Sequence, residues 1–219
     1  MPIQIYGHPF SSYTQKALTA LYENAVPFDF LELSPEHPDH LAAFEQRWPI
    51  KRFPLLVEGN RQVMERMAII EYLDVHHPGS VRLIPRDADA AMEVRMLDRC
   101  FDNYIHTPLQ KLVFNQLRPE ADRDPWGVGE ARAMLDTAYA WLDRHMAGRE
   151  WAAGDSFSMA DCAAAPALFY ADWAHPIGAG LANARAYRAR LLARPSFARC
   201  VEEGRPYRPF FPLGAPDRD

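Results

Sequence analysis

The sequence predicts a chain of two parts, in which a mixed α/β region is followed by a region built only of helices. Residues 1–78 carry short apolar runs and helical spacings in the order β-α-β-α-β-β-α, which predicts a mixed four-stranded sheet covered by helices. After residue 87 apolar residues recur at helical spacing and no strand pattern stands out. We therefore expect an N-terminal domain at 1–78, a linker at 79–86 and an all-α C-terminal domain at 87–219 with an irregular proline-rich tail.

The first strand and the first helix are the most sharply defined elements. Ile3 and Ile5 alternate with less apolar neighbours, and a Gly-Pro turn ends this strand. Ser12 is followed three residues later by Gln15, which is the spacing of a capping box, so a helix is predicted to begin there with Ser12 as its cap. The hydroxyls of Ser11 and Ser12 then lie at the positive end of the helix dipole, where a phosphate, a carboxylate or a thiolate is stabilised.

The other elements of the α/β region follow from short patterned runs. An aromatic run at 28–33, bounded by prolines, predicts a second strand that lies parallel to the first through a right-handed crossover. Strands at 53–57 and 62–64 form a predicted hairpin. Helices are expected at 39–47 and 65–75.

The helices of the second region have clear apolar spacing. Ser158 and Asp161 form an acidic variant of the capping box ahead of an alanine-rich helix, and we interpret both as structural. The prolines after residue 205 predict a tail that is not helical, and its aromatic residues 207–211 fold over the site, lie on the partner domain or form a loose end. Apolar spacing predicts further helices at 97–105, 131–146, 187–193 and 196–203, with a loop at 119–129.

Composition excludes several classes of function. The net charge is −5 with acids and bases interspersed, so no basic stripe offers a nucleic-acid surface or attraction to anionic membranes. No apolar stretch is long enough to span a bilayer and no signal-peptide pattern is present, so we expect a cytoplasmic protein. The three cysteines are far apart and follow residue 99, which argues against a disulfide framework. No Cys/His group has the spacing of metal ligands, so no metal is expected.

Several of these segments together resemble the cytosolic glutathione transferase family. They are the strand-loop-helix that carries Ser11, the Phe53-Pro54 step, the stretch at 65–73 and the Ser158/Asp161 cap, and the resemblance extends from residue 3 to about residue 203. It is nearest in style to serine-type classes such as phi. The resemblance implies a thioredoxin-like N-terminal domain, an all-helical C-terminal domain, and a homodimer with two glutathione sites that acts in detoxification.

The resemblance also implies a set of glutathione-binding residues. Phe53 contacts the cysteinyl backbone of the tripeptide, and Pro54 follows a cis peptide bond, which is found in only about 5–6% of X–Pro bonds. Arg52 matches a further contact residue, and His40 matches the histidine after the second strand, with His37 as the alternative.

One position departs from the family pattern. The family usually has Glu-Ser where this chain has Glu65-Arg66, and the serine normally holds the γ-glutamyl carboxylate at a helix N-terminus. Arg66 meets the same carboxylate through its fork of donors, clashes with it, or points away into a dimer contact.

The opening serines suit activation of a glutathione thiol. A free cysteine thiol has a pKa of about 8.5, and lowering it by about two needs roughly 2.7 kcal/mol. A hydrogen bond to a charged group supplies roughly 1.5–3 kcal/mol, and a helix N-terminus adds about 0.3–1 kcal/mol. Spacing alone favours two capping serines, and the resemblance favours Ser11 as the donor with Ser12 as the cap. Tyr6 and Tyr13 are rival hydroxyls, whereas a protein-thiol redox mechanism is excluded because residues 1–99 contain no cysteine.

Aromatic residues supply the candidate pocket for a hydrophobic electrophile. Phe10, Tyr104 and Phe114 are the expected lining, together with Phe101 and His106, although aromatics at helical spacing are more often core. The predicted activity is attack of the glutathione thiolate on a small apolar electrophile. The alternatives are a non-catalytic or weakly binding protein on the same fold and a glutathione-dependent isomerase or lyase.

Overall fold

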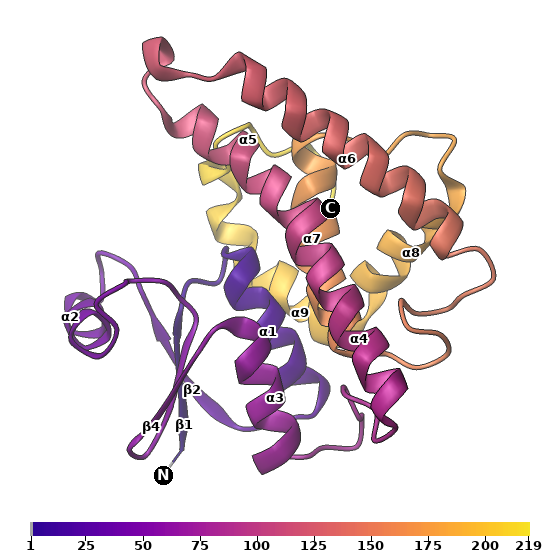
Figure 1. The fold of residues 1–219 in the computed structure, drawn as a ribbon. Helices are drawn as coiled ribbons and strands as arrows, with labels where there is room; N and C mark the ends of the chain where they lie inside the picture. The colour runs from indigo at the N-terminus through magenta and orange to yellow at the C-terminus, as the bar shows by residue number, and fades with distance from the viewer. Residues whose placement is uncertain (1) are drawn as a thin grey trace.

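A mixed four-stranded sheet forms the first part of the computed structural model, which describes residues 2–219 (Figure 1). The strand order is β2-β1-β3-β4. β1 (Ile3–Gly7) pairs in parallel with β2 (Phe28–Glu32) and antiparallel with β3 (Leu55–Glu58), which forms a hairpin with β4 (Arg61–Met64). The predicted mixed sheet is therefore confirmed, including the parallel pair and the hairpin.

Three helices cover the two faces of this sheet. α1 (Ser12–Glu23) and α3 (Arg66–His76) lie on one face, and α2 (Pro38–Arg47) lies on the other (Figure 1). Alternation along β1 explains the two layers, because Ile3 and Ile5 point to the face covered by α1 and α3, whereas Tyr6 packs with Phe44 of α2.

A long helical run begins the second part and contains a wide turn. It consists of α4 (Ala88–Phe101), the π-helical turn η1 (Asp102–His106) and α5 (Thr107–Leu117). The run begins well before the predicted residue 97, since Asp87 caps α4 by accepting from Ala90 N–H at 2.9 Å. Pro108 lies in the first turn of α5, where a missing N–H is tolerated.

The remaining helices surround α7. α7 (Met159–Ala174) is buried over almost its whole length, and α6 (Pro125–His145), α8 (Ala182–Ala193) and α9 (Pro195–Gly204) complete the region. α6 begins inside the segment predicted as a loop, because Asp124 accepts from Gly127 N–H at 2.8 Å and Pro125 suits a first helical turn.

The predicted capping box of α7 is confirmed. Asp161 Oδ2 accepts from both the backbone N–H and the hydroxyl of Ser158, at 2.8 and 2.9 Å. The other oxygen of Asp161 accepts from Ala152 N–H at 2.9 Å and from the Tyr187 hydroxyl at 2.6 Å. Burial raises the pKa of Asp161. The pair therefore ties the start of the central helix to two neighbouring segments.

The prediction of a tail without helix is wrong for its first residues. Residues Arg205–Phe210 form the 3₁₀ helix η3, which tolerates Pro206 at its first turn. The chain then turns back onto α7, where Arg218 pairs with Asp172. No helix of residues 2–219 combines the length and apolarity needed to cross a bilayer. The predicted domain limits at 78 and 87 stay a prediction, although the stretch between α3 and α4 forms no strand or helix.

Candidate active site

A cavity of about 610 Å³ opens at the N-terminus of α1, between the sheet and the helical region. Its polar wall comes from the loops of the N-terminal part, and its apolar wall comes from α5, α7 and the tail. The polar wall includes His8, Ser11, Arg52, Glu65 and Arg66, with the apolar ring of Phe53 among them. The apolar wall includes Leu109, Val113, Phe114, Tyr170, Phe210 and Phe211.

Ser11 is the N-cap of α1 and lines this cavity. Its backbone is extended, at φ −85° and ψ 120°, and its Oγ accepts from Thr14 N–H at 3.3 Å. A serine hydroxyl has one proton and two lone pairs, so this cap leaves the hydroxyl proton available to a ligand. One side chain can therefore cap the helix and donate into the cavity.

The prediction that Ser12 caps α1 is wrong. Ser12 is buried inside the first helical turn, and its Oγ lies 2.6 Å from Nε2 of His106 in η1. The Gln15 amide donates to Pro9 O at 2.9 Å and to the Tyr170 hydroxyl at 3.1 Å instead of closing a capping box. The first turn of α1 packs against the helical region, which supplies partners that the local sequence does not reveal.

His8 holds the turn before Ser11. Its Nδ1 accepts from Phe10 N–H at 3.1 Å, and its carbonyl accepts from Ser11 N–H at 3.0 Å. Burial lowers the pKa of His8 against the opposing effect of Glu32. A neutral imidazole that accepts at Nδ1 carries its proton on Nε2. The turn that presents Ser11 is therefore held from both sides by one residue.

The Phe53–Pro54 peptide bond is cis, as predicted. Pro54 is buried at the start of β3, and Phe53 is partly exposed and lines the cavity. Arg52 is exposed beside them and lines the same wall. Arg52, Phe53 and Pro54, which were predicted as glutathione-binding or structural residues, thus lie together at one edge of the cavity.

Glu65 and Arg66 begin α3 at the cavity. Glu65 has a left-handed backbone, at φ +68°, and supplies no side-chain cap. Arg66 turns toward η1, where its Nη2 and Nε lie 2.9 and 3.3 Å from Asp102 Oδ1. Its guanidinium also lies 4.3 Å from the centroid of the Tyr13 ring. The Arg66 side chain is directed into its own subunit. Of the three alternatives for Arg66, the outward dimer contact is therefore wrong.

Two predicted contact residues lie outside the cavity. His40 is engaged at the end of β2, with its Nδ1 3.0 Å from Glu32 O and its ring stacked on His37. Tyr104 is 52% exposed and does not line the cavity among residues 2–219. Tyr104 lies in the π turn η1, where the regular helical spacing on which its prediction rested does not hold.

The other aromatic candidates divide between cavity and core. Phe10 and Phe114 line the cavity, as predicted, whereas Phe101 and His106 are buried behind it. Burial, Arg66 and Lys16 together lower the pKa of His106 well below its usual range. Of the rival hydroxyls, Tyr13 reaches the cavity and Tyr6 lies on the opposite face of the sheet.

Sequence reasoning missed much of the apolar wall. Leu109 and Val113 project from α5 and Tyr170 from α7, and helical spacing does not distinguish a cavity wall from core at these positions. Phe211 of the tail is buried against the Tyr170 and Phe10 rings, with centroids 6.0 and 6.5 Å away. The adjacent aromatics of the tail were the available signal. They fold over the site, which was one of the three alternatives.

Comparison with known proteins gives the family. The family models "Glutathione S-transferase, N-terminal domain" and "Glutathione S-transferase, C-terminal domain" match residues 5–81 and 90–190. Glutathione S-transferase 3 of Zea mays is 30% identical over 213 residues, which cover 91% of this chain and 93% of the relative. The chain belongs to the glutathione S-transferase family.

Two further comparisons agree with this membership. A probable maleylacetoacetate isomerase of Vibrio cholerae is 27% identical over 218 residues, covering 94% of this chain and 98% of the relative. A glutathione S-transferase structure from Methylobacterium radiotolerans, solved in complex with glutathione sulfonate, has a TM-score of 0.78 and 27% identity, and covers 92% of this chain and 95% of that one. The expected thioredoxin-like domain followed by a helical domain is confirmed, and the residue roles stay predictions.

Proposed function

We propose that this glutathione S-transferase family member conjugates glutathione to small hydrophobic electrophiles, with Ser11 as the hydrogen-bond donor to the thiolate. The observation that carries the proposal is the position of Ser11, a helix N-cap on the cavity wall whose hydroxyl proton is not used by the cap. Such a hydroxyl and the helix dipole together supply about the 2.7 kcal/mol that lowers a thiol pKa by two.

The bond changes follow from thiolate chemistry. The sulfur forms a carbon–sulfur bond with the electrophile, and either a halide leaves with its electron pair or the carbanion of a conjugate addition takes a proton from water. Ser11 stabilises the negative charge on sulfur before the attack. The reaction needs no protein-based nucleophile.

Glutathione is proposed to lie along the polar wall. Its cysteinyl backbone meets Phe53 beside the cis Pro54, and its γ-glutamyl carboxylate meets the start of α3 at Glu65 and Arg66. Unpaired N–H groups at a helix N-terminus favour an anion at that place. Arg52 is close enough to the same wall to assist, whereas His40 lies outside the cavity and needs a change of its ring position to contribute.

The apolar wall indicates an uncharged electrophile. The cationic residues that line the cavity, Lys51, Arg52 and Arg66, belong to the N-terminal part, and the residues from α5, α7 and the tail carry no formal charge. A maleyl-type substrate carries carboxylates that would find no cation on that wall. A glutathione-dependent isomerase is therefore less favoured than a transferase. It is kept as the second candidate because the Vibrio cholerae relative is named a probable maleylacetoacetate isomerase.

The working protein is proposed to be a cytoplasmic homodimer. α3 and α4 adjoin at the surface through the Glu71–Arg95 ion pair, and exposed apolar side chains lie on the same two helices. These side chains are Val75, Met92 and Met96. Burying such a patch in a dimer removes apolar surface from water. The three cysteines are free thiols, which suits a reducing compartment and a role in detoxification.

Calorimetry and an activity panel test the function. Glutathione is titrated into the purified chain, and the panel contains halogenated aromatics, isothiocyanates and maleyl-type isomers. Binding together with conjugation of the uncharged compounds supports the proposal. Isomerisation of the maleyl compounds without conjugation favours the second candidate, and absence of heat and of a thermal shift at millimolar glutathione favours a non-catalytic protein. Light scattering during gel filtration tests the dimer.

A further inference from the structure

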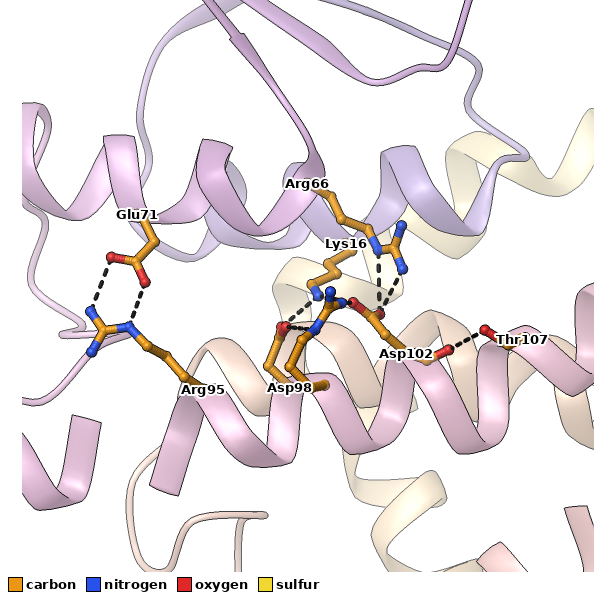
Figure 2. A network of polar contacts seen from close by, with 8 residues as sticks. Lys16, Arg66, Glu71, Arg95, Asp98, Asp102 and Thr107 are labelled. Atoms are coloured by element: carbon orange, nitrogen blue, oxygen red, sulfur yellow. Dashed lines mark hydrogen bonds and ion pairs between the residues drawn. The ribbon is translucent and has the colours of Figure 1, made fainter. Parts of the chain in front are cut away.

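A buried cluster of charges joins the two parts of the chain directly behind the cavity. The ammonium of Lys16 in α1 lies 2.5 Å from Asp98 and 3.0 Å from Asp102 (Figure 2). Arg66 of α3 pairs with Asp102 from the other side, and Arg99 contacts both carboxylates. Lys16 is 1% exposed and Asp98 is 0% exposed. Four elements, α1, α3, α4 and η1, therefore meet at this cluster.

The cluster carries a surplus positive charge. It contains three cations and two carboxylates, so one positive charge has no counterpart within it. Arg99 is 47% exposed and its charge is largely met by solvent, so the part of the surplus that can act on a ligand is the charge of Arg66 at the cavity. Burial lowers the pKa of Lys16 to about 8 although Asp98 opposes the change, so Lys16 is charged at neutral pH.

Arg66 is the member of the cluster that reaches the cavity. Asp102 accepts from the Nε and Nη2 edge of its guanidinium, and the fork of an arginine has further donors on its remaining nitrogen. Asp102 alone would neutralise Arg66. Lys16 supplies a second positive charge to Asp102 and offsets Asp98, which leaves the charge of Arg66 available to a ligand.

We propose that Lys16 is a positioning residue for carboxylate binding, because it balances Asp98 and Asp102 so that Arg66 can neutralise the γ-glutamyl carboxylate of glutathione. This inference rests on the proposed function, in which glutathione is the ligand of the cavity. It explains how an arginine can stand where the family usually has a serine. The carboxylate completes the charge balance of the cluster, and no member of the cluster other than Arg66 has to touch it.

The structure contains a matched control at the same helix boundary. Glu71 of α3 and Arg95 of α4 form a two-pronged ion pair, with distances of 2.6 and 3.0 Å, on the surface beside the buried cluster (Figure 2). This pair joins the same two helices and does not line the cavity. Arg95→Met therefore removes an ion pair between α3 and α4 without changing the charge behind Arg66.

The test compares two ligands that differ in one carboxylate. S-methylglutathione is titrated calorimetrically beside its analogue in which a 4-aminobutanoyl group replaces the γ-glutamyl group, which removes only the α-carboxylate. Lys16→Met is expected to weaken binding of S-methylglutathione about tenfold and to change binding of the analogue less than about twofold. Arg95→Met is expected to bind both ligands like the unmodified protein.

A double variant that restores the net charge of the cluster separates the effect of charge from that of packing. Lys16→Met combined with Asp98→Asn removes one charge of each sign, so the cluster regains its surplus, and binding of S-methylglutathione should recover to within about twofold of the unmodified protein. Equal weakening of both ligands by Lys16→Met, or failure of the double variant to recover while it remains folded by circular dichroism, overturns the inference.

A pH profile of binding provides a second measurement. Lys16 is surrounded by Asp98, Asp102, Arg66 and Arg99, and His106 lies nearby, so its deprotonation above pH 8 removes the surplus charge. The dissociation constant of S-methylglutathione should rise between pH 7 and 9.5 more for the unmodified protein than for the variant that combines Lys16→Met with Asp98→Asn, because the amino group of the ligand titrates equally in both measurements. Parallel pH profiles contradict the inference. If the unmodified protein binds neither ligand, both the proposed function and this inference are wrong. If it binds S-methylglutathione and the binding does not depend on Lys16, only this inference is wrong.

Discussion

Thr14 donates its backbone N–H to the Ser11 hydroxyl at 3.3 Å, so the cap of α1 is also a hydroxyl of the cavity. The adjacent serine has a different role, since Ser12 points into the helical region and meets His106 at 2.6 Å. Two neighbouring hydroxyls therefore separate into one that faces the cavity and one that joins the two parts of the chain.

Replacing Ser12 is expected to affect stability more than chemistry. Ser12→Ala leaves the His106 ring without its buried partner, which should lower the free energy of unfolding by about 1–3 kcal/mol. Conjugation by the protein that remains folded should keep its thiolate pKa. Chemical denaturation measures the first effect, and spectroscopic titration of bound glutathione measures the second. If the thiol pKa of bound glutathione is raised in Ser12→Ala, the donor is Ser12, which contradicts the proposed role of Ser11.

His106 should make the fold less stable in mild acid. Burial lowers its folded-state pKa well below 6.5, so below that pH the unfolded chain binds a proton that the folded chain excludes. Stability should therefore fall as the pH drops below about 6.5, by at most roughly 1.4 kcal/mol per pH unit for one group. His8 acts in the same direction. His106→Gln keeps a polar group beside Ser12 without titrating, and should flatten this slope in denaturation curves at pH 5 to 7.

Asp161 should be one of the most sensitive positions for folding. It is buried and accepts four hydrogen bonds, from Ala152 N–H, Ser158 N–H, the Ser158 hydroxyl and the Tyr187 hydroxyl. Asp161→Ala leaves these donors unpaired and is expected to destabilise the protein by about 3–5 kcal/mol. Thermal unfolding measures the loss. If the loss is under about 1 kcal/mol, Asp161 contributes no more to stability than an exposed helix cap does, which would contradict this prediction.

The two aromatic residues of the tail should separate specificity from stability. Phe210 is 74% exposed and lines the cavity, so Phe210→Ala should raise the KM for a bulky aromatic electrophile about threefold to tenfold and leave unfolding almost unchanged. Phe211 is buried against Tyr170, and Phe211→Ala should cost about 3–5 kcal/mol of stability. Steady-state kinetics with a small and a large electrophile make the comparison. Unchanged kinetics for Phe210→Ala would remove the tail from electrophile binding.

Local patterns in the sequence were sufficient for most of the fold. Alternation at Ile3 and Ile5, the Ser158/Asp161 capping box and the proline at the start of β3 each depend on neighbouring residues, and the structure has all three features where they were expected. These features are local, so a single sequence contains the information that predicts them. Ser11, which lines the cavity, was singled out by the resemblance to the family and not by spacing alone.

The parts that sequence reasoning missed depend on contacts between distant segments. Ser12 lies inside the first helical turn and, instead of capping the helix, contacts His106, which is ninety-four positions away. Tyr104 lies in the π turn η1, which periodicity at 3.6 residues does not reveal. The ion pair between Arg66 and Asp102 joins the two parts of the chain, and neither residue alone signals it.

The central claim concerns the sulfur of glutathione at residue 11. Ultraviolet absorbance of the thiolate is recorded against pH for glutathione bound to the unmodified protein and to Ser11→Ala, with Ser12→Ala as the matched control. The unmodified protein and the control should lower the thiol pKa by about two from its usual 8.5, and Ser11→Ala should lose most of that effect. An unchanged titration midpoint in Ser11→Ala, with glutathione still bound, would contradict the claim.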